Sequence, residues 1–559
     1  MKHTRKVPLV VLTAAALSLT ACAQSDRNSG NTASSGASGA SNTKDTFTFG
    51  AAGAPKLFDP FYATDGETFR VTRQIHSGLL GVKEGSADVE PDLAESWEPS
   101  ADGLAWNFKL RQNVKFSDGT PFDAEAVCYN MDRMYNQKGA GQTAAEYWGY
   151  FFGSFSDKPE DSLYKSCEAK DASHAVINIT RSTSSFPTIL SLDSFSMQSP
   201  TALKAGDANN VVAEGEGFKY PAYSVAPVGI GPYKLDKYDE ANKTVTLVAN
   251  DQYFGEKPKT GKIVFKIIPD EATRRQELQA GSIDGYDLPN PVDWKGLKDD
   301  GNQVAVRPAF NILYMGLNSN ANPKLKDLKV RQAIYYALNR EQMVKTQLPE
   351  GAKVATQFMP DTVSGYNTDL KPYAYDPEKA KALLKEAGAE GMTLQFAFPT
   401  EVTRPYMPDP QKIHAAFKKD LEAVGIKVDV VNKPWNGGYL DDANAGKYDA
   451  WLLGWTGDYN AADNFLGTFF SNYEENDMQT SAYPWGKTLS DDLKKADAIV
   501  DVAEREAAYQ KINKQIAEEY LPGLPISHSP PALVVSDKVE GLVPSPLTAE
   551  MFDTVTVKQ

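Results

Sequence analysis

The chain has 559 residues, with 58 Lys and Arg against 73 Asp and Glu, and a formal net charge of −15 at pH 7. A chain of this length is too long for one hydrophobic core and predicts two or three domains. Nucleic acids and anionic membrane surfaces are negatively charged, so the acidic balance argues against either as a partner.

The N-terminus has the pattern of a secretory signal. Three basic residues among the first six precede an apolar run from Val7 to Leu19, which is too short to span a bilayer. The run ends in Leu-Thr-Ala-Cys at Cys22, and this tetrapeptide resembles the lipobox of bacterial lipoproteins at all four positions. The resemblance implies cleavage before Cys22 and attachment of lipid, including palmitate, to that residue. The alternative is an ordinary signal peptide with a chance cysteine.

Residues 23–44 are rich in Ser, Gly, Ala and Asn and cannot bury enough apolar surface to fold. A flexible coil of this composition is expected to hold the domain roughly 25 Å from the bilayer. No other segment approaches the run of about 18 apolar residues that a membrane helix needs. The lipid on Cys22 is therefore the only membrane attachment that the sequence predicts.

Two cysteines, Cys128 and Cys167, remain besides Cys22. In an oxidising compartment two cysteines favour one disulfide; two buried free thiols are the alternative. The sequence has no Cys-x-x-Cys pattern, and its histidines after the signal are not clustered, so we expect neither a metal site nor a cofactor.

The first half of the chain predicts strands joined by turns and a few helices. A hairpin is expected with its turn at Asp102-Gly103, and Asp123 is expected to cap a helix that runs through Met134. Between 144 and 225 the chain is rich in Ser and aromatic residues, with short strand-like runs. Further strands are expected near 233–235, 244–248 and 263–268, and a helix over about 271–280.

The second half predicts alternating helices and strands. Helices are expected after Asp327, Asp376 and Asp409, each of which can cap the first turn. Strands are expected over 393–398, 426–431 and 448–453. A strand, helix and following strand imply parallel pairing with a right-handed crossover, so the chain is predicted to be of the α/β class.

The strand at 448–453 is followed by Asp458, which lies between Trp455 and Tyr459. Ligands of α/β domains bind at the carboxyl ends of the strands. A carboxylate among aromatic rings suits a cationic group on a largely apolar ligand, such as the amino terminus of a peptide. The alternative is that Trp455 and Tyr459 are core residues and that Asp458 caps the next helix.

Arg404 lies in the loop before the helix that begins at Asp409. If both strands belong to one sheet, Arg404 and Asp458 project from the same edge. Opposite charges there would suit a zwitterion, because a guanidinium matches a carboxylate in two-point contact. The alternative is that Arg404 pairs directly with Glu401 or Asp458, or stacks on Tyr406.

Seven motifs occur in order along the chain. They are Leu-Phe-Asp-Pro at 57–60, Leu-Ala-Glu-Ser-Trp at 93–97, Asp-Gly-Leu-Ala-Trp-Asn-Phe-Lys-Leu-Arg at 102–111, Val-Lys-Phe-Ser-Asp-Gly-Thr-Pro-Phe-Asp at 114–123, Gly-Ile-Gly-Pro-Tyr-Lys at 229–234, Leu-Lys-Asp-Leu-Lys-Val-Arg-Gln-Ala at 325–333 and Gly-Trp-Thr-Gly-Asp at 454–458. With them the chain resembles, from about residue 47 to its C-terminus, the family 5 solute-binding proteins of ABC importers, the dipeptide, oligopeptide and nickel receptor group.

This resemblance implies a two-lobed α/β clamp of the periplasmic-binding-protein type II, with an extra subdomain inserted in lobe one. The expected division is signal peptide 1–21, tether 22–45, lobe one 46–91, inserted subdomain 92–225, lobe one 226–315, lobe two 316–524 and lobe one 525–559. The resemblance also implies a monomer that delivers its ligand to an ABC permease and its ATPase subunits.

Residue roles follow from the same resemblance. In the family the aspartate of the last motif, here Asp458, pairs with the amino terminus of the peptide. In its dipeptide receptors an arginine at the position of Arg404 takes the carboxylate. Trp435 and Trp455 resemble tryptophans that line side-chain pockets, and Tyr406 and Tyr459 complete the predicted ligand-binding residues.

Two positions depart from the family pattern. Oligopeptide receptors often carry an arginine where this chain has Leu452, which favours short peptides. Ala461-Ala462 replace a common Asp-Pro pair, so the side-chain preference stays open.

The predicted function is a lipid-anchored receptor for dipeptide-like ligands on the extracytoplasmic face of the cell membrane. Oligosaccharides are an alternative, because aromatic rings such as Trp435 also stack on sugars; nickel or a metal chelate is a weaker one. The sequence has no Gly-x-Ser-x-Gly, zincin or phosphate-loop motif, so no enzyme is predicted. A surface adhesin or signalling protein is the remaining class.

Overall fold

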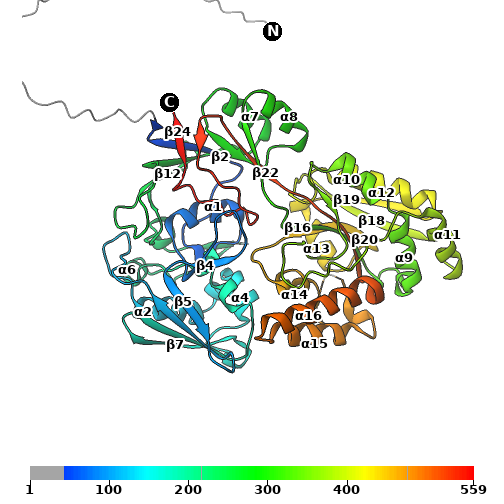
Figure 1. The fold of residues 1–559 in the computed structure, drawn as a ribbon, viewed down its shortest axis with the longest axis horizontal. Coiled ribbons are helices and arrows are strands. Elements are labelled where there is room, and N and C mark those ends of the chain that lie inside the picture. The colour runs from blue at the N-terminus through cyan, green and yellow to red at the C-terminus, as the bar shows by residue number, and fades with distance from the viewer. Residues whose placement is uncertain (1–42, 216, 475, 477) are drawn as a thin grey trace, which may run out of the picture. The chain divides into compact units, whose positions relative to one another are not determined.

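The computed structural model describes residues 43–559 except 216, 475 and 477 (Figure 1). The predicted signal peptide, Cys22 and most of the tether lie outside these residues. Within the described part, no helix combines the length and the apolar character needed to cross a bilayer. Helices and strands alternate there, and the three largest sheets of the described residues have seven, six and four strands.

The seven-stranded sheet joins both ends of the described chain. Its order is β11 (Tyr233–Asp239), β12 (Thr244–Ala249), β13 (Lys262–Ile267), β2 (Thr46–Ala51), β14 (Gly285–Asp287), β22 (Ala532–Val535) and β15 (Gln303–Val306). β2 is parallel to β13 and β14, whereas β22 is antiparallel to its two neighbours. A strand from the C-terminal segment thus completes the sheet that the N-terminal strand begins (Figure 1).

Helices cover both faces of this sheet. Side chains alternate between the two faces of a strand, so Leu533 and Val535 of β22 face one way and Val534 the other. The first two pack in the cluster that includes Val71 of α1 (Gly66–Ile75). Val534 packs with Leu278 of α7 (Glu271–Gln279) and with α8 (Trp294–Asp299).

An antiparallel sheet of four strands forms the centre of residues 94–179. Its order is β5 (Ala94–Pro99), β6 (Ala105–Leu110), β8 (His174–Ile179) and β7 (Tyr164–Asp171). The predicted hairpin is confirmed, with Gly103 in its turn at a φ of 68°, which glycine adopts without strain. The predicted helix is α2 (Ala124–Tyr135), whose cap Asp123 accepts a bond from the Ala126 amide at 2.9 Å.

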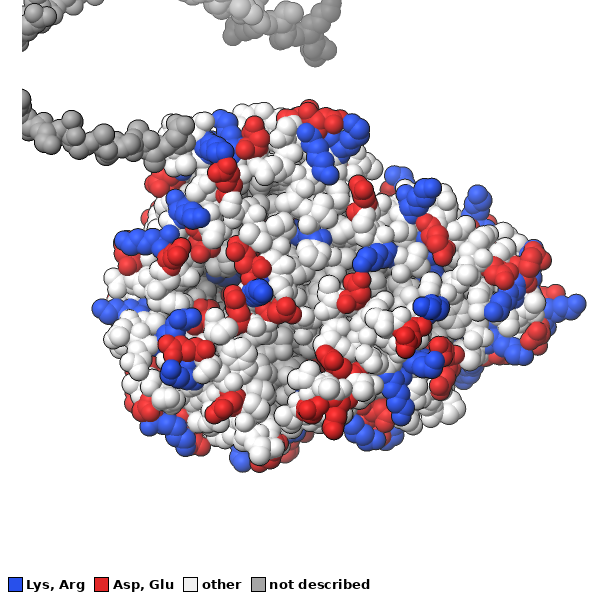
Figure 2. All heavy atoms as spheres, in the orientation of Figure 1, with Lys and Arg blue, Asp and Glu red and all other residues white. Residues whose placement is uncertain are grey.

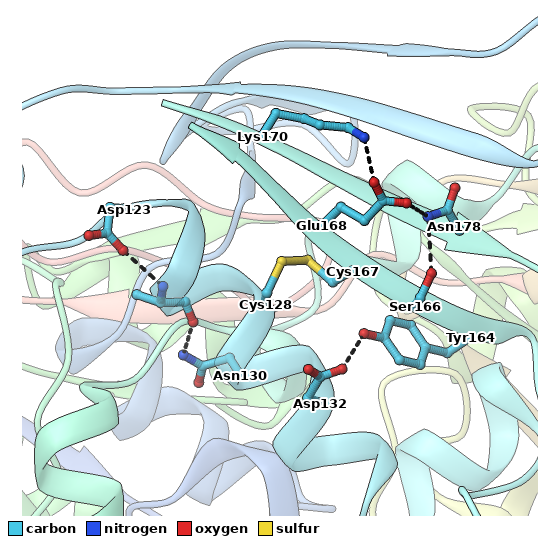
Figure 3. The surroundings of a disulfide bond; sticks show 11 residues. Asp123, Cys128, Asn130, Asp132, Tyr164, Ser166, Cys167, Glu168, Lys170 and Asn178 are labelled. Carbon is cyan, nitrogen blue, oxygen red and sulfur yellow. Dashed lines mark hydrogen bonds and ion pairs between the residues drawn. A yellow bond between two sulfur atoms is a disulfide. The ribbon is translucent and has the colours of Figure 1, made fainter. Parts of the chain in front are cut away.

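A disulfide joins this sheet to α2. Cys128 on α2 and Cys167 on β7 are bonded, with an S–S distance of 1.95 Å (Figure 3). Close to the disulfide, the hydroxyl of Tyr164, three residues before Cys167, donates to Asp132, four residues after Cys128, at 2.6 Å. Helix and strand are therefore linked at two neighbouring points.

The six-stranded sheet combines parallel and antiparallel pairs. Its order is β17 (Lys353–Val354), β21 (Gly523–His528), β16 (Asn311–Leu317), β20 (Ala450–Thr456), β18 (Thr393–Thr400) and β19 (Lys427–Pro434). β18 is parallel to β19, as the strand–helix–strand pattern predicted, and it is also parallel to β20, which joins the same sheet as expected. The last predicted strand begins and ends later than expected, because its pairing with β16 extends to the Asn311–Thr456 pair.

Three predicted helices pack on this sheet. They are α9 (Leu328–Ala337), α11 (Pro377–Glu386) and α12 (Pro410–Ala423), and their N-caps are the predicted Asp327, Asp376 and Asp409. Their apolar sides share one cluster with β16, β18 and β20. α12 follows β18 directly, so it fixes the loop that precedes it at the carboxyl end of β18.

Two predicted domain boundaries need correction. The divisions at 315/316 and 524/525 fall inside β16 and β21, and both strands belong wholly to the six-stranded sheet. A boundary cannot cut a strand that is hydrogen-bonded along its length. The chain therefore passes between the two large sheets after β15 and before β16, and again after β21 and before β22.

Removing the disulfide should destabilise the protein without changing its fold. Its sequence separation is 39, and closing a loop of about 40 residues stabilises the folded state by about 4 kcal/mol in the chain-entropy model. We expect the Cys128→Ser, Cys167→Ser double variant to unfold at a lower urea concentration than the wild type. Reductant should lower the wild-type midpoint and leave that of the variant unchanged; equal midpoints for both oxidised proteins would contradict the prediction.

Candidate ligand-binding site

Parallel pairing brings two charged loops to one edge of the six-stranded sheet. β18 and β20 are adjacent and parallel, with Phe396 opposite Ala450, so the loops that follow them leave from the same edge. Arg404 lies in the first loop and Asp458 in the second. The first loop is closed by two backbone bonds between Arg404 and Met407, of 3.2 and 2.9 Å.

The guanidinium of Arg404 rests on an aromatic ring. It lies 4.3 Å from the ring centroid of Trp435, which is a cation–π distance. Its Nε is buried and has no hydrogen-bond partner. Among residues 43–559, with the gaps stated above, Arg404 forms no ion pair, and its ring partner is Trp435, so the alternative of direct pairing with Glu401 or Asp458 is not observed. The charge is held in place without being neutralised.

Tyr406 connects the Arg404 loop to β20. Its ring is buried and packs on the backbone of Gly454, where a Cβ atom would come within 2.4 Å of the ring. Only glycine at this position allows the two loops to approach so closely. Burial, opposed by the charge of Arg404, raises the pKa of Tyr406 to about 12, so its hydroxyl stays neutral. Tyr406 therefore positions the loop, and its ring is largely covered by protein.

Asp458 is held by neutral groups. Its backbone N–H donates to Oδ1 of Asn464 at 2.8 Å, and Tyr147 donates its hydroxyl to the Asp458 carboxylate at 3.4 Å. Within the described chain the carboxylate has no ion pair with a basic side chain. Burial raises the pKa of Asp458 to about 6, while the bonds from Asn464 and Tyr147 oppose that change. The helix-cap alternative is wrong, because the next helical turn, η8 (Ala462–Asn464), follows Ala461.

The two aromatic neighbours of Asp458 differ in their surroundings. Trp455 is partly exposed and donates its indole N–H to Asn464 at 3.4 Å. Tyr459 is 2% exposed, donates its hydroxyl to Asp463 at 2.8 Å and meets Phe151 edge-on at 5.5 Å. Tyr459 is thus packed in protein, as in the core alternative, whereas Trp455 still has exposed surface.

Residues distant in sequence complete the site, and the sequence analysis missed them. Tyr147 and Phe151 come from α4 (Glu146–Phe152), and Phe69 of α1 meets Tyr147 edge-on at 5.6 Å. Asn464 is also new. The only sequence signal for α4 is its run of aromatic residues, which equally fits a core helix.

A pair of acids, Asp463 and Asp497, lies near Tyr459. Asp497, at the end of α15 (Gly486–Asp497), accepts bonds from the hydroxyls of Ser184 and Ser185 at 3.2 and 3.4 Å. Burial, with the charge of Asp497 nearby, raises the pKa of Asp463 to about 7. These bonds tie the segment around residue 184 to the six-stranded half of the chain.

Other kinds of site find little support. Among the described side chains, no group of three or more His, Cys, Asp or Glu could hold a metal ion. Acidic and basic side chains are intermixed on the face in Figure 2, whereas a nucleic-acid surface gathers Lys and Arg. An open surface pocket of about 410 Å³ borders the loop at Glu401 and Asp409, but neither Arg404 nor Asp458 lines it.

Comparisons with known proteins identify the family and the fold of the chain. The family model for bacterial extracellular solute-binding proteins, family 5, matches residues 88–477. The dipeptide-binding protein of Escherichia coli (strain K12) is 31% identical over 528 residues, covering 92% of this chain and 95% of that protein. Heme-binding protein A of Haemophilus influenzae is 30% identical over 563 residues, covering 98% of each.

Solved structures show the same fold. HbpA2 from Haemophilus parasuis has a TM-score of 0.79 at 29% identity, covering 92% of this chain and all of that one. The periplasmic binding protein DppA from Helicobacter pylori, in complex with the peptide STSA, has a TM-score of 0.71 at 26% identity, covering 92% and 99%. The resemblance inferred from the sequence is confirmed: the chain belongs to family 5 of the bacterial extracellular solute-binding proteins and has their two-lobed α/β clamp.

Proposed function

We propose that this protein is a lipid-anchored receptor of an ABC importer that captures dipeptide-like ligands between its lobes. The observation that carries the proposal is the placement of Arg404 and Asp458 at one sheet edge, each without an ionic partner in the described chain. Two unpaired charges of opposite sign at one site suit a zwitterion. The name of the Escherichia coli relative, a dipeptide-binding protein, supports this choice.

In this proposal the peptide is held by its two ends. Asp458 accepts the ammonium group, and the guanidinium of Arg404 makes a two-point contact with the carboxylate. The termini of a dipeptide lie about 6–7 Å apart at about 3.5 Å per residue. Trp455 contributes apolar surface beside the ligand, while water and spare room accommodate different side chains. Closure of the lobes, with Tyr147 against Asp458, then excludes solvent.

The proposed cellular location rests on the N-terminal sequence. Lipid on Cys22 and the tether after it would keep the receptor at the extracytoplasmic face of the membrane, next to its permease and ATPase subunits. The proposed lobe one contains the seven-stranded sheet and the subdomain at 92–225, and lobe two contains the six-stranded sheet. Monomers suffice for this role, because one clamp encloses one ligand.

Binding measurements can distinguish peptides from the other candidate ligands. One relative is named a heme-binding protein, and oligosaccharides remain an alternative from the sequence. The ring of Trp435 carries the guanidinium of Arg404, so it is less available for stacking on a sugar. Mass spectrometry of ligand that co-purifies with the protein, followed by titration with hemin, Ni²⁺ and maltose as controls, distinguishes these ligands from peptides.

Blocking either end of the ligand should abolish tight binding. Removing one partner of a buried charged pair costs about 3–5 kcal/mol, which is more than a hundredfold in Kd. By calorimetry we expect an N-acetylated dipeptide and a dipeptide amide each to bind the wild type far more weakly than the free dipeptide. In Asp458→Ala, acetylation should no longer weaken dipeptide binding, whereas amidation still should. In Arg404→Ala, amidation should no longer weaken binding, whereas acetylation still should. Unchanged wild-type affinity after acetylation would refute the role of Asp458.

Acid should weaken ligand binding through Asp458. Because its pKa is raised to about 6, the carboxyl is mostly ionised at pH 7 and mostly neutral at pH 5, where it can no longer pair with an ammonium group. Dipeptide affinity should therefore fall about tenfold between pH 7 and pH 5. Asp458→Asn should bind weakly with little pH dependence. Asp463→Asn is the control, since it removes a nearby acid that does not contact the ligand; loss of the pH dependence there would assign the effect to Asp463.

A further inference from the structure

One buried amide, that of Asn464, connects two partly exposed residues of the Asp458 loop, Trp455 and Asp458 itself. Asn464 ends η8 and is 2% exposed. Its Oδ1 accepts the backbone N–H of Asp458 at 2.8 Å and the indole N–H of Trp455 at 3.4 Å. A single oxygen atom therefore fixes both the carboxylate-bearing residue and the ring beside it.

Asn464 is itself firmly anchored. Its backbone N–H donates to the carbonyl of Ala461 at 3.2 Å, and its carbonyl accepts the hydroxyl of Thr468 at 2.8 Å. Thr468 lies on α14 (Leu466–Phe470), whose Leu466, Phe469 and Phe470 are buried in the core. The backbone of Asn464 is thus anchored to η8 and to the packed helix α14 that follows, and its side-chain amide holds the Asp458 loop.

The residue before Asp458 is Gly457, which offers no side chain that could hold the loop. Gly457 donates its N–H to the carbonyl of Phe310 at 2.9 Å. A Cβ atom there would lie 2.3 Å from the ring of Phe310 and 2.7 Å from that of Phe465, so no larger residue fits. With no side chain available at 457, the N–H of Asp458 is the next point at which the loop can be fixed.

The absence of charge on the Asn464 side chain matters as much as its position. A carboxylate at 464 could accept the same two bonds, but it would place a second negative charge beside Asp458 and favour the protonated form of that acid. An apolar side chain would leave the Asp458 N–H and the indole N–H without this acceptor. An uncharged acceptor meets both requirements.

We infer that Asn464 is the positioning residue for amino-terminal recognition, because it holds Asp458 and Trp455 where they meet the ligand. This inference rests on the proposed function and adds a residue to it. Asn464 need not touch the ligand; it acts through the two residues that its carbonyl oxygen binds.

The test is the ratio of Kd values for an N-acetylated and a free dipeptide, which reports recognition of the ammonium group alone. We expect Asn464→Ala to reduce this ratio at least tenfold relative to the wild type and to change the tryptophan fluorescence response to the dipeptide. The matched control is Asn513→Ala, which removes another buried amide from the same half of the chain, where it donates to the carbonyl of Gly365 at 3.2 Å. The control should lower the melting temperature and leave the ratio unchanged.

A second variant covers the case in which Asn464→Ala does not fold. Asn464→Asp keeps both acceptor bonds, so it should retain the wild-type ratio at pH 8 while the pH at which binding is half lost moves upward by about one unit. If both variants keep the Kd ratio of the wild type, and if the pH midpoint of Asn464→Asp is unchanged, this inference is overturned while the proposed function stands. If the wild type itself binds the N-acetylated and the free dipeptide with equal Kd, the proposed function is overturned and this inference with it.

Discussion

The parallel pairing of β18 with β20 is the constraint on which the site depends. Because both strands run in the same direction, their carboxyl ends meet at one edge and present the loops of Arg404 and Asp458 together. Packing reinforces the pairing, since Tyr406 of one loop lies on Gly454 of the other strand. β20 also pairs with β16, the strand that follows the first passage between the large sheets. The Asp458 loop therefore follows a strand that lies directly beside one of the two connecting strands, and the Arg404 loop follows the next strand in the sheet.

Each charged side chain of the site is supported by neutral groups. The guanidinium of Arg404 lies on the π face of Trp435, and Asp458 is held by the amide of Asn464 and the hydroxyl of Tyr147. A salt bridge inside the protein would orient these groups equally well, but it would neutralise the charges that the proposed zwitterionic ligand needs. Partly buried charges without partners are costly, so such an arrangement favours any ligand that supplies the missing counter-charges. This cost is visible in the raised pKa of Asp458.

The sequence predicts local structure and the parallel strand pairs well. Asp123, Asp327 and Asp409 all cap the helices expected of them, because capping depends on a few adjacent residues. Contacts between distant residues were not predictable. Tyr147 and Asp458 are 311 positions apart, and no local pattern distinguishes a tyrosine that closes on a site from one in the core. The burial of Tyr459 and the cation–π contact of Trp435 likewise depend on which element packs against each ring.

A short segment of α4 links the proposed ligand site to the packing between the two halves. Tyr147 and Phe151 are four residues apart, so they lie on one face of the helix. Tyr147 bonds to Asp458 and Phe151 packs on Tyr459, which are consecutive residues. Asp458 therefore meets α4 through a polar contact, and Tyr459 meets it through an apolar contact. Any shift of α4 relative to the Asp458 loop must change both contacts at once, so the proposed capture of a ligand would be coupled to the packing of α4 on this loop.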